Sequence, residues 1–183
     1  MTSDRLIVQQ SLPTVDVTLE DGSVVKGIHL LGELTVITQQ TVVQATPTIT
    51  AGAYASGDAI GGLLTFENVV EADGDGFTID GIVITDKGKQ DANIDLVLFD
   101  DTFTATADNA VFDPSDTDLL KCLGYIPSGA YADFNDNSVM RRSGLGFNGV
   151  LVGTSLYGQL VARGTPTYTS TSDLTVRLYI RRD

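Results

Sequence analysis

Residues 92–124 constrain the fold of this chain more than any other stretch. They open with the segment NIDLVLF (93–99), which is the strongest strand signal in the sequence. One side of an extended chain here would carry Ile94, Leu96 and Leu98, and the other would carry Val97 and Phe99. Because successive side chains of a strand point to opposite faces, the segment predicts a strand that is central in its sheet or covered on its second side.

A short helix is predicted after the polar run 100–109. Asp113 is expected as its N-cap, Pro114 suits the first turn, and Gly124 follows the last helical residue. Acidic side chains at Asp116 and Asp118 favour the positive end of the helix dipole. The leucines of the helix are Leu119, Leu120 and Leu123. We expect this apolar side to cover the second face of the strand.

The remaining pattern is typical of an all-β domain. The chain has 183 residues, enough for one domain with a core, and short apolar alternations outnumber helical periods. About eight strands are expected from residue 46 onward, separated by Gly and Asp turns, with a candidate bulge at Gly81. The last of them alternates clearly, with Leu174, Val176, Leu178 and Ile180 inward. This spacing predicts a sandwich or a barrel.

Residues 1–45 differ from the rest and are expected to form an N-terminal arm. Alternating apolar residues on both sides of Asp21-Gly22 predict a β-hairpin, and residues 34–37 and 42–43 are further extended candidates. An isolated hairpin is marginally stable in water, so the arm should pack on another chain or on the main domain. The predicted division is therefore an arm at 1–45 and a β-sandwich at 46–183.

Charge and composition exclude several classes of partner. With 24 acidic residues against 11 Lys and Arg, the formal net charge is −13. Such a surface repels nucleic acid and anionic membranes, and no stretch approaches the length of about 20 apolar residues that spans a bilayer. The first ten residues lack the pattern of a signal peptide. A single cysteine, Cys122, excludes an internal disulfide.

No cofactor site is predicted. Residues 144–149 match G-x-G-x-x-G, but strand-like residues follow where a dinucleotide site needs a helix, so we interpret them as a glycine-rich turn. Residues 73–76 and 133–137 alternate oxygen donors without the spacing of an EF-hand. An irregular calcium loop stays open there, beside the simpler reading that Asp and Asn form turns.

No catalytic or metal-binding residues are predicted either. The one histidine, His29, lies in the predicted arm, and Cys122 is interpreted as a packing residue. A paired-carboxylate glycosidase stays open because aspartates are plentiful, although such enzymes normally have aromatic sugar-binding clefts and this chain has no Trp.

An interaction surface is the remaining candidate site. Arg177 and Arg181 should share the outward side of the last strand with Tyr179, and Tyr and Arg are enriched in protein interfaces. An ordinary solvated strand face is the equal alternative. Val97 and Phe99, on the second face of the 93–99 strand, complete the set of candidate interface residues.

From about Ile49 onward the chain resembles a family of structural, cement or decoration proteins of tailed-bacteriophage heads. The resemblance is carried by 53–58 (AYASGD) with 61–64, 86–90, 95–100 (DLVLFD), 112–116 (FDPSD), 131–137 (YADFNDN) and 156–168. It covers roughly three quarters of the chain, and the segments YADFNDN and LVARGTPTYTS are its most specific parts. The N-terminal segment differs from the longer leader usual in this family.

The resemblance implies a fold, partners and a location. It implies an antiparallel β-sandwich of jelly-roll type, without catalytic residues, on the outer surface of the phage head. The expected partners are the major capsid protein and further copies of this chain, with a trimer favoured over a dimer. The protein would be made in the cytoplasm of the bacterial host.

Two other functions stay open. A receptor- or glycan-binding module of a head fibre or tail would need an exposed aromatic cleft, for which Tyr125, Tyr131, Phe134 and Tyr168 are candidates. A hydrolytic virion enzyme would need two carboxylates that converge in a cleft.

Overall fold

The computed structural model describes residues 14–18, 24–28 and 40–182, and the chain divides into two compact units, Met1–Ile37 and Thr38–Asp183. In the first unit, β1 (Thr14–Thr18) and β2 (Val24–Ile28) pair antiparallel, from Thr14 opposite Ile28 to Thr18 opposite Val24. This confirms a strand pair at the predicted hairpin. Its turn residues, residues 34–37 and His29 lie outside the described residues.

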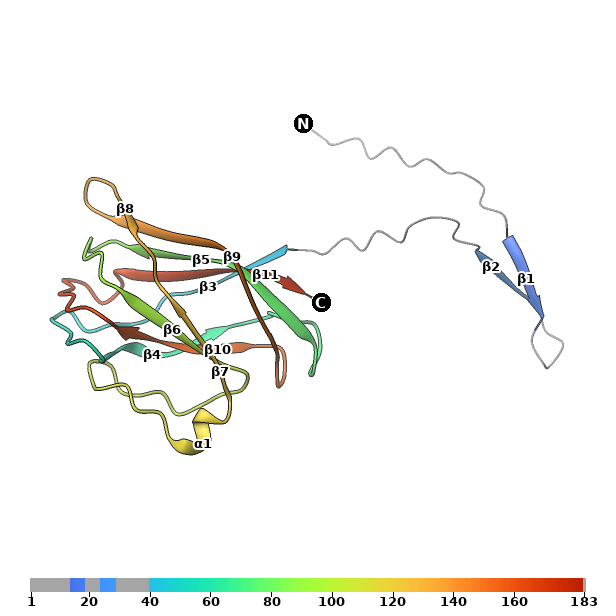
Figure 1. The fold of residues 1–183 in the computed structure, drawn as a ribbon, viewed down its shortest axis with the longest axis horizontal. Coiled ribbons are helices and arrows are strands. Elements are labelled where there is room, and N and C mark those ends of the chain that lie inside the picture. Colours follow the sequence, from blue (N-terminus) through green and yellow to red (C-terminus); the bar gives the residue numbers. More distant parts are fainter. Residues whose placement is uncertain (1–13, 19–23, 29–39, 183) are drawn as a thin grey trace. The chain divides into compact units, whose positions relative to one another are not determined.

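The second unit is an antiparallel β-sandwich with one short helix (Figure 1). A five-stranded sheet has the order β3 (Gln40–Ala45), β11 (Leu174–Arg182), β5 (Gly76–Asp86), β9 (Ser138–Val150) and β8 (Tyr131–Asp133). A four-stranded sheet has the order β4 (Ala59–Phe66), β10 (Leu156–Ala162), β6 (Ile94–Phe99) and β7 (Cys122–Pro127). The predicted all-β class and the antiparallel sandwich are thereby confirmed.

The strand pairs are nested along the chain. β3 pairs with β11, β4 pairs with β10, and β5 pairs with β9, so early strands meet late ones. Such an order is expected when a long antiparallel hairpin rolls into two sheets, and it favours the jelly-roll type, which itself stays a prediction.

The core lies between the two sheets and follows the alternation seen in the sequence. The four apolar residues of β11, Leu174, Val176, Leu178 and Ile180, are fully buried. They meet the inward side chains of β6, where Ile94, Leu96 and Leu98 join the same core. β6 lies between β10 and β7, and all six of its residues are buried, as the two-sided apolar pattern of residues 94–99 predicts.

The sandwich begins earlier than residue 46. β3, whose residues were assigned to the arm, forms six register pairs with β11, from Ala45 opposite Val176 to Gln40 opposite Arg181. The reason is visible in the burial of β3, since Val43 points into the core while Val42 is 50% exposed. The division between the units lies at 37/38, and the predicted boundary at residue 45 was eight residues too late.

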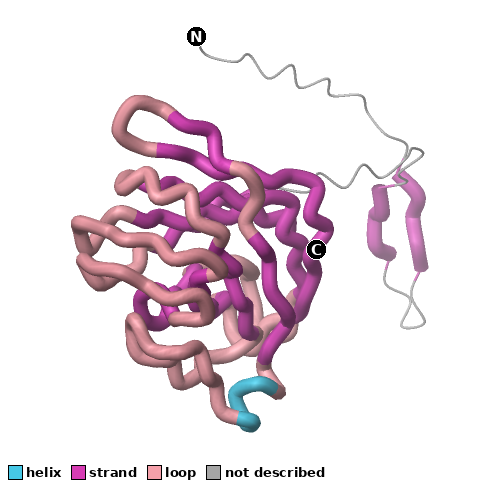
Figure 2. Tube along the Cα trace, turned by 60° about the vertical axis from the view of Figure 1, so that its left-hand side comes forward, coloured by secondary structure: helices cyan, strands magenta, loops and turns pink. Residues whose placement is uncertain are grey.

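A loop, rather than the helix, covers the second face of β6. Val97 and Phe99 pack in a small cluster with Phe103 and Val161, and the rings of Phe99 and Phe103 stack with centroids 3.8 Å apart. The helix α1 (Asp116–Leu119) has Ser115, not Asp113, as its N-cap. Leu119 and Leu120 are exposed, Leu120 to 87%, and Leu123 lies in β7 instead of the helix, so the predicted apolar contact of the helix with the strand was wrong. Figure 2 shows α1, in cyan, outside the strands of the sandwich.

Two local predictions were also inexact, and the predicted irregularity near Gly81 is present. Residues 46–50, where the series of expected strands begins, are irregular. The register of β5 shifts at Asp80, next to the predicted bulge at Gly81, where an added Cβ would lie 2.9 Å from the carbonyl oxygen of Arg142. The glycines of 144–149 lie inside β9, and Gly144 and Gly146 have φ of 69° and 59°. This motif is thus an irregularity within a strand, not a turn, and no helix follows it.

Among the described residues, no helix has the length and apolarity to cross a membrane.

Candidate interaction surface

The predicted residues Arg177, Tyr179 and Arg181 lie together on the outer side of the five-stranded sheet. They alternate with the buried residues of β11 and therefore point away from the core. Arg177 lies between Gln44 of β3 and Val83 of β5, and Arg141 of β9 is the next residue in that row, opposite Val83. We call the surface formed by Arg141, Arg177, Tyr179 and Arg181 the arginine face.

A cation–π contact joins two strands of the arginine face. The guanidinium carbon of Arg141 lies 5.6 Å from the centre of the Tyr179 ring. Both residues line a shallow depression of about 170 Å³ that also includes Gln40, Asp80 and Ser143. The depression therefore combines a cation, an aromatic ring and polar groups that can donate or accept hydrogen bonds.

The positive charge of the arginine face is only partly balanced. Arg181 lies 3.3 Å from the carboxylate of Asp80, and Arg177 donates a hydrogen bond of 3.1 Å to the amide oxygen of Gln44. Within residues 40–182, neither Arg141 nor Arg177 has a carboxylate within 4.0 Å. Two exposed guanidinium groups are thus available on a chain of net charge −13.

Other arginines near the C-terminus hold the fold. Arg163 donates a hydrogen bond of 2.7 Å to Asp95, and Arg182 binds the carbonyl oxygens of Val69 and Asn68 as well as Glu71. Of the four arginines in residues 163–183, only Arg177 and Arg181 therefore belong to the candidate surface.

Val97 and Phe99 do not belong to a free surface, because the loop over β6 and β10 covers them. Gln159 of β10, fully buried, fixes this loop by donating to the carbonyl oxygens of Thr106 and Gly61 and by accepting from the N–H of Thr106. The prediction that both are interface residues is contradicted because their side chains are buried, and Phe99 has an exposed fraction of 0%.

Asp108 fixes the same loop to β4 and to the segment before it. Its carboxylate accepts hydrogen bonds from the hydroxyls of Thr50 and Tyr54 and from the N–H of Gly61, at 2.6–2.7 Å. Burial and this carboxylate raise the pKa of Tyr54, so its phenol remains a donor across the physiological range.

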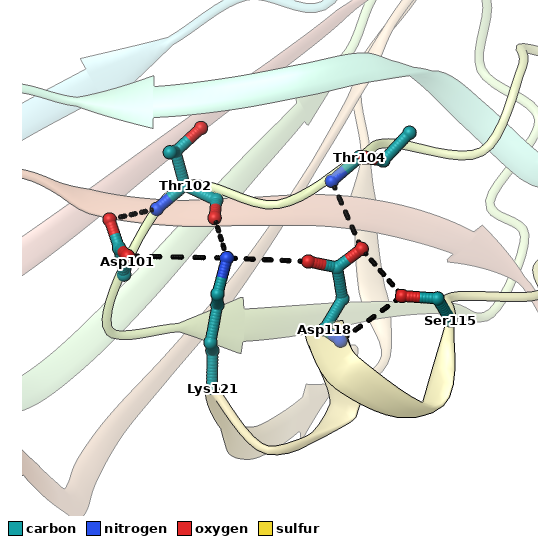
Figure 3. A network of polar contacts seen from close by, with 6 residues as sticks. All are labelled: Asp101, Thr102, Thr104, Ser115, Asp118 and Lys121. Carbon is teal, nitrogen blue, oxygen red and sulfur yellow. Dashed lines mark hydrogen bonds and ion pairs between the residues drawn. The ribbon is translucent and has the colours of Figure 1, made fainter.

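A polar network holds α1 and the end of the loop (Figure 3). The Asp118 carboxylate accepts from the hydroxyl of Ser115 and the N–H of Thr104, and it lies 3.3 Å from the ammonium of Lys121. Lys121 also donates to the carbonyl oxygen of Thr102 at 2.5 Å. The hydrogen bond from Ser115, followed by that from Thr104, lowers the pKa of Asp118. The network has the character of a structural support, since each polar group in it has a partner.

The aromatic residues proposed for a sugar-binding cleft do not assemble. Tyr168 is buried beside Tyr54, with ring centroids 6.1 Å apart, and the hydroxyl of Tyr131 is buried. Tyr125 and Phe134 are exposed, but they belong to β7 of one sheet and to the turn after β8 of the other. The described residues therefore do not form the exposed aromatic cleft that glycan binding would need.

The aspartates of the first candidate calcium loop, residues 73–76, accept hydrogen bonds from backbone groups, and Asp133 of the second lies 3.7 Å from the ammonium of Lys89. Asp73 accepts from the N–H of Gly153, and Asp75 accepts from the N–H of Ala72. No group of three or more His, Cys, Asp or Glu side chains suited to a metal occurs in the part of the chain that the structure describes. Cys122 is half-buried and lies at the start of the strand β7, outside the helix. It packs against the cluster that contains Phe99.

A search of protein-family models, curated proteins and solved structures finds no match to this chain. The interpretation of the arginine face therefore depends on its own geometry. Sequence patterns indicated three of its residues, and they missed Arg141. Only the register of β9 against β5 places Arg141 in the row of Arg177, and the sequence pattern does not show that register.

Proposed function

We propose that this chain is a non-enzymatic structural protein of a bacteriophage virion, which decorates the outside of the capsid and stabilises it by bridging major capsid protein subunits. The resemblance of residues 49–168 to head decoration proteins supports the proposal from the sequence. The structure supports it with a rigid sandwich that presents an arginine face.

The observation that carries the proposal is the division of the chain into two compact units. The first contains a sheet of two described strands, β1 and β2, and such a ribbon buries too little apolar surface to be stable alone in water. We infer that it is stabilised on the surface of a capsid subunit, while the sandwich associates with further copies of this chain.

Attachment at two places explains how modest contacts can stabilise a shell. The second contact of a tethered protein forms at a high effective concentration, so the overall affinity exceeds that of either unit. A protein that binds only the assembled shell also raises the free energy of opening it by mass action.

Deletion of residues 1–37 tests this proposal, because the cut leaves β3 and the whole sandwich intact. Capsids that lack the protein are incubated with the full chain or with residues 38–183, sedimented, and assayed for bound protein. We expect the truncated chain to fold, as judged by its β-sheet circular dichroism, and to lose at least about tenfold in apparent affinity. Unchanged occupancy by the truncated chain would overturn the two-point attachment, and failure of the full chain to bind would overturn the proposed function.

A further inference from the structure

The arginine face is poorly suited to a symmetric contact with itself. In a twofold interface the same patch lies on both sides, so Arg141 and Arg177 would meet the arginines of the partner. Like charges placed across an interface disfavour binding. The face therefore fits a partner surface that is acidic and has some exposed apolar area.

The chain carries such a surface itself. Residues 100–118 contain six aspartates and no Lys or Arg, and we call them the acidic segment. Asp113 and Asp116 are exposed, and neither side chain has a hydrogen bond or ion pair within the described ranges. They line an open cavity of about 630 Å³ beside Thr104 and Thr106.

Exposed apolar side chains flank these carboxylates. Val111 is 72% exposed and Leu120 is 87% exposed, so the acidic segment and the residue that caps α1 offer apolar area as well as charge. The arginine face has the matching combination, with Tyr179 partly exposed and Val42 exposed beside it. Burial of such groups at the centre of a charged contact is the usual arrangement of a protein interface.

We propose that the arginine face of one copy binds the acidic segment of a second copy, in a head-to-tail contact. The proposal specifies the self-association within the proposed function and rests on it. The occupant of the face is another copy of this chain, and Arg141 and Arg177 bind the carboxylates of Asp113 and Asp116.

The fold determines what such a contact produces. The arginine face lies on the outer side of the five-stranded sheet, whereas the acidic segment lies over the outer side of the four-stranded sheet (Figure 1). A dimer thus keeps one free surface of each kind, and a head-to-tail contact extends unless its rotation closes a ring. We expect an average mass that rises with protein concentration and falls with added salt, because exposed charges are screened.

Complementary variants test the contact with the purified full chain. Variant A carries Arg141→Glu and Arg177→Glu, and variant B carries Asp113→Asn and Asp116→Asn; all four positions are exposed. Sedimentation velocity at low ionic strength measures association of each variant and of their equimolar mixture. We expect association to weaken by more than about tenfold for A and for B alone. The mixture should form a one-to-one dimer, since B keeps the arginine face and A keeps the acidic segment.

Matched controls separate this contact from a general effect of charge or from unfolding. Lys87→Glu reverses one exposed charge that belongs to neither surface and should leave association unchanged, whereas Arg177→Glu should weaken it. Circular dichroism and thermal melting confirm that each variant is folded. A wild-type chain that is monomeric at every concentration, a variant A that associates normally, or a mixture that stays monomeric would each overturn the proposal. None of these results depends on capsids, so they leave the deletion test of the proposed function intact.

Discussion

Asp86 shows how single carboxylates shape the loops of this sandwich. It ends β5, is fully buried, and accepts hydrogen bonds from the backbone N–H groups of Gly88, Gln90 and Asp91 at 2.8–3.1 Å. Burial raises its pKa, and the three donors offset this effect only in part. The side chain therefore holds the turn after β5 at an electrostatic cost when it is charged.

Replacement of Asp86 should change both stability and its dependence on pH. Asp86→Asn places an NH2 group against N–H donors, which should lower the free energy of unfolding by about 1–3 kcal/mol at pH 7. Because the folded pKa is raised, the pH-dependent part of the contribution of Asp86 is complete below its unfolded pKa of about 3.9 and is lost as pH rises through the folded value, whereas the three hydrogen bonds account for the loss expected at pH 7. The difference between wild type and variant should thus be largest near pH 4 and shrink above it.

Urea unfolding of both proteins from pH 4 to 7 measures this difference. Asp116→Asn, at an exposed carboxylate, is the control and should change the free energy of unfolding by less than about 0.5 kcal/mol. A difference between wild type and Asp86→Asn that grows as pH rises would contradict the assignment.

For single residues, the sequence pattern predicted the face to which a side chain points better than it predicted what that side chain contacts. The alternation of β11 placed Arg177, Tyr179 and Arg181 outward because a strand has a period of two. The same rule placed Val97 and Phe99 correctly on the second face of β6 but could not show what lies there. Their cover is provided by Phe103, and contact between a strand and a long loop leaves no periodic signal.

The loop between β6 and α1 is the element that distinguishes this sandwich most from a plain pair of sheets. Phe103 is 7% exposed and attaches the loop to Phe99, while Gln159 binds both the loop and β4. The loop therefore behaves as part of the fold, and it supports the acidic segment on a fixed base.

Removal of the Phe103 ring should destabilise the protein through this element. Phe103→Ala loses a buried stacked ring and leaves a cavity over β6, so we expect the free energy of unfolding to fall by about 3–5 kcal/mol. Phe134→Ala is the matched control, because Phe134 is 58% exposed and its loss should cost less than about 0.5 kcal/mol. Chemical denaturation of the two variants tests this, and equal losses would show that the loop does not depend on Phe103.

Strong strands were predicted from the sequence and weak elements were not. β6 and β11 have clear apolar patterns, and both were located to within one or two residues. The predicted start and apolar side of the helix were wrong because Ser115, rather than Asp113, caps it and only four residues follow. β3 was assigned to the arm because QTVVQA is short and half polar, and pairing with β11, more than 130 residues away, decides its place.

For the whole molecule, charge and division into units are the properties that bear on function. In the proposed head-to-tail contact, the arginine face of an acidic chain binds the acidic segment of a second copy, while the rest of the acidic surface repels it. We expect this arrangement to favour ordered self-association and to limit aggregation. Composition predicted the acidity, but the concentration of unpaired arginines on one sheet depends on the register of β9, β5 and β11.

The central claim, that this protein decorates a capsid, is tested most directly by its copy number in phage particles that contain it. Quantitative mass spectrometry of purified particles gives the ratio of this chain to the major capsid protein. A decoration protein should be present at a copy number comparable to that of the capsid subunits, over the whole head. A few copies per particle would contradict the account and would indicate a fibre or tail component instead.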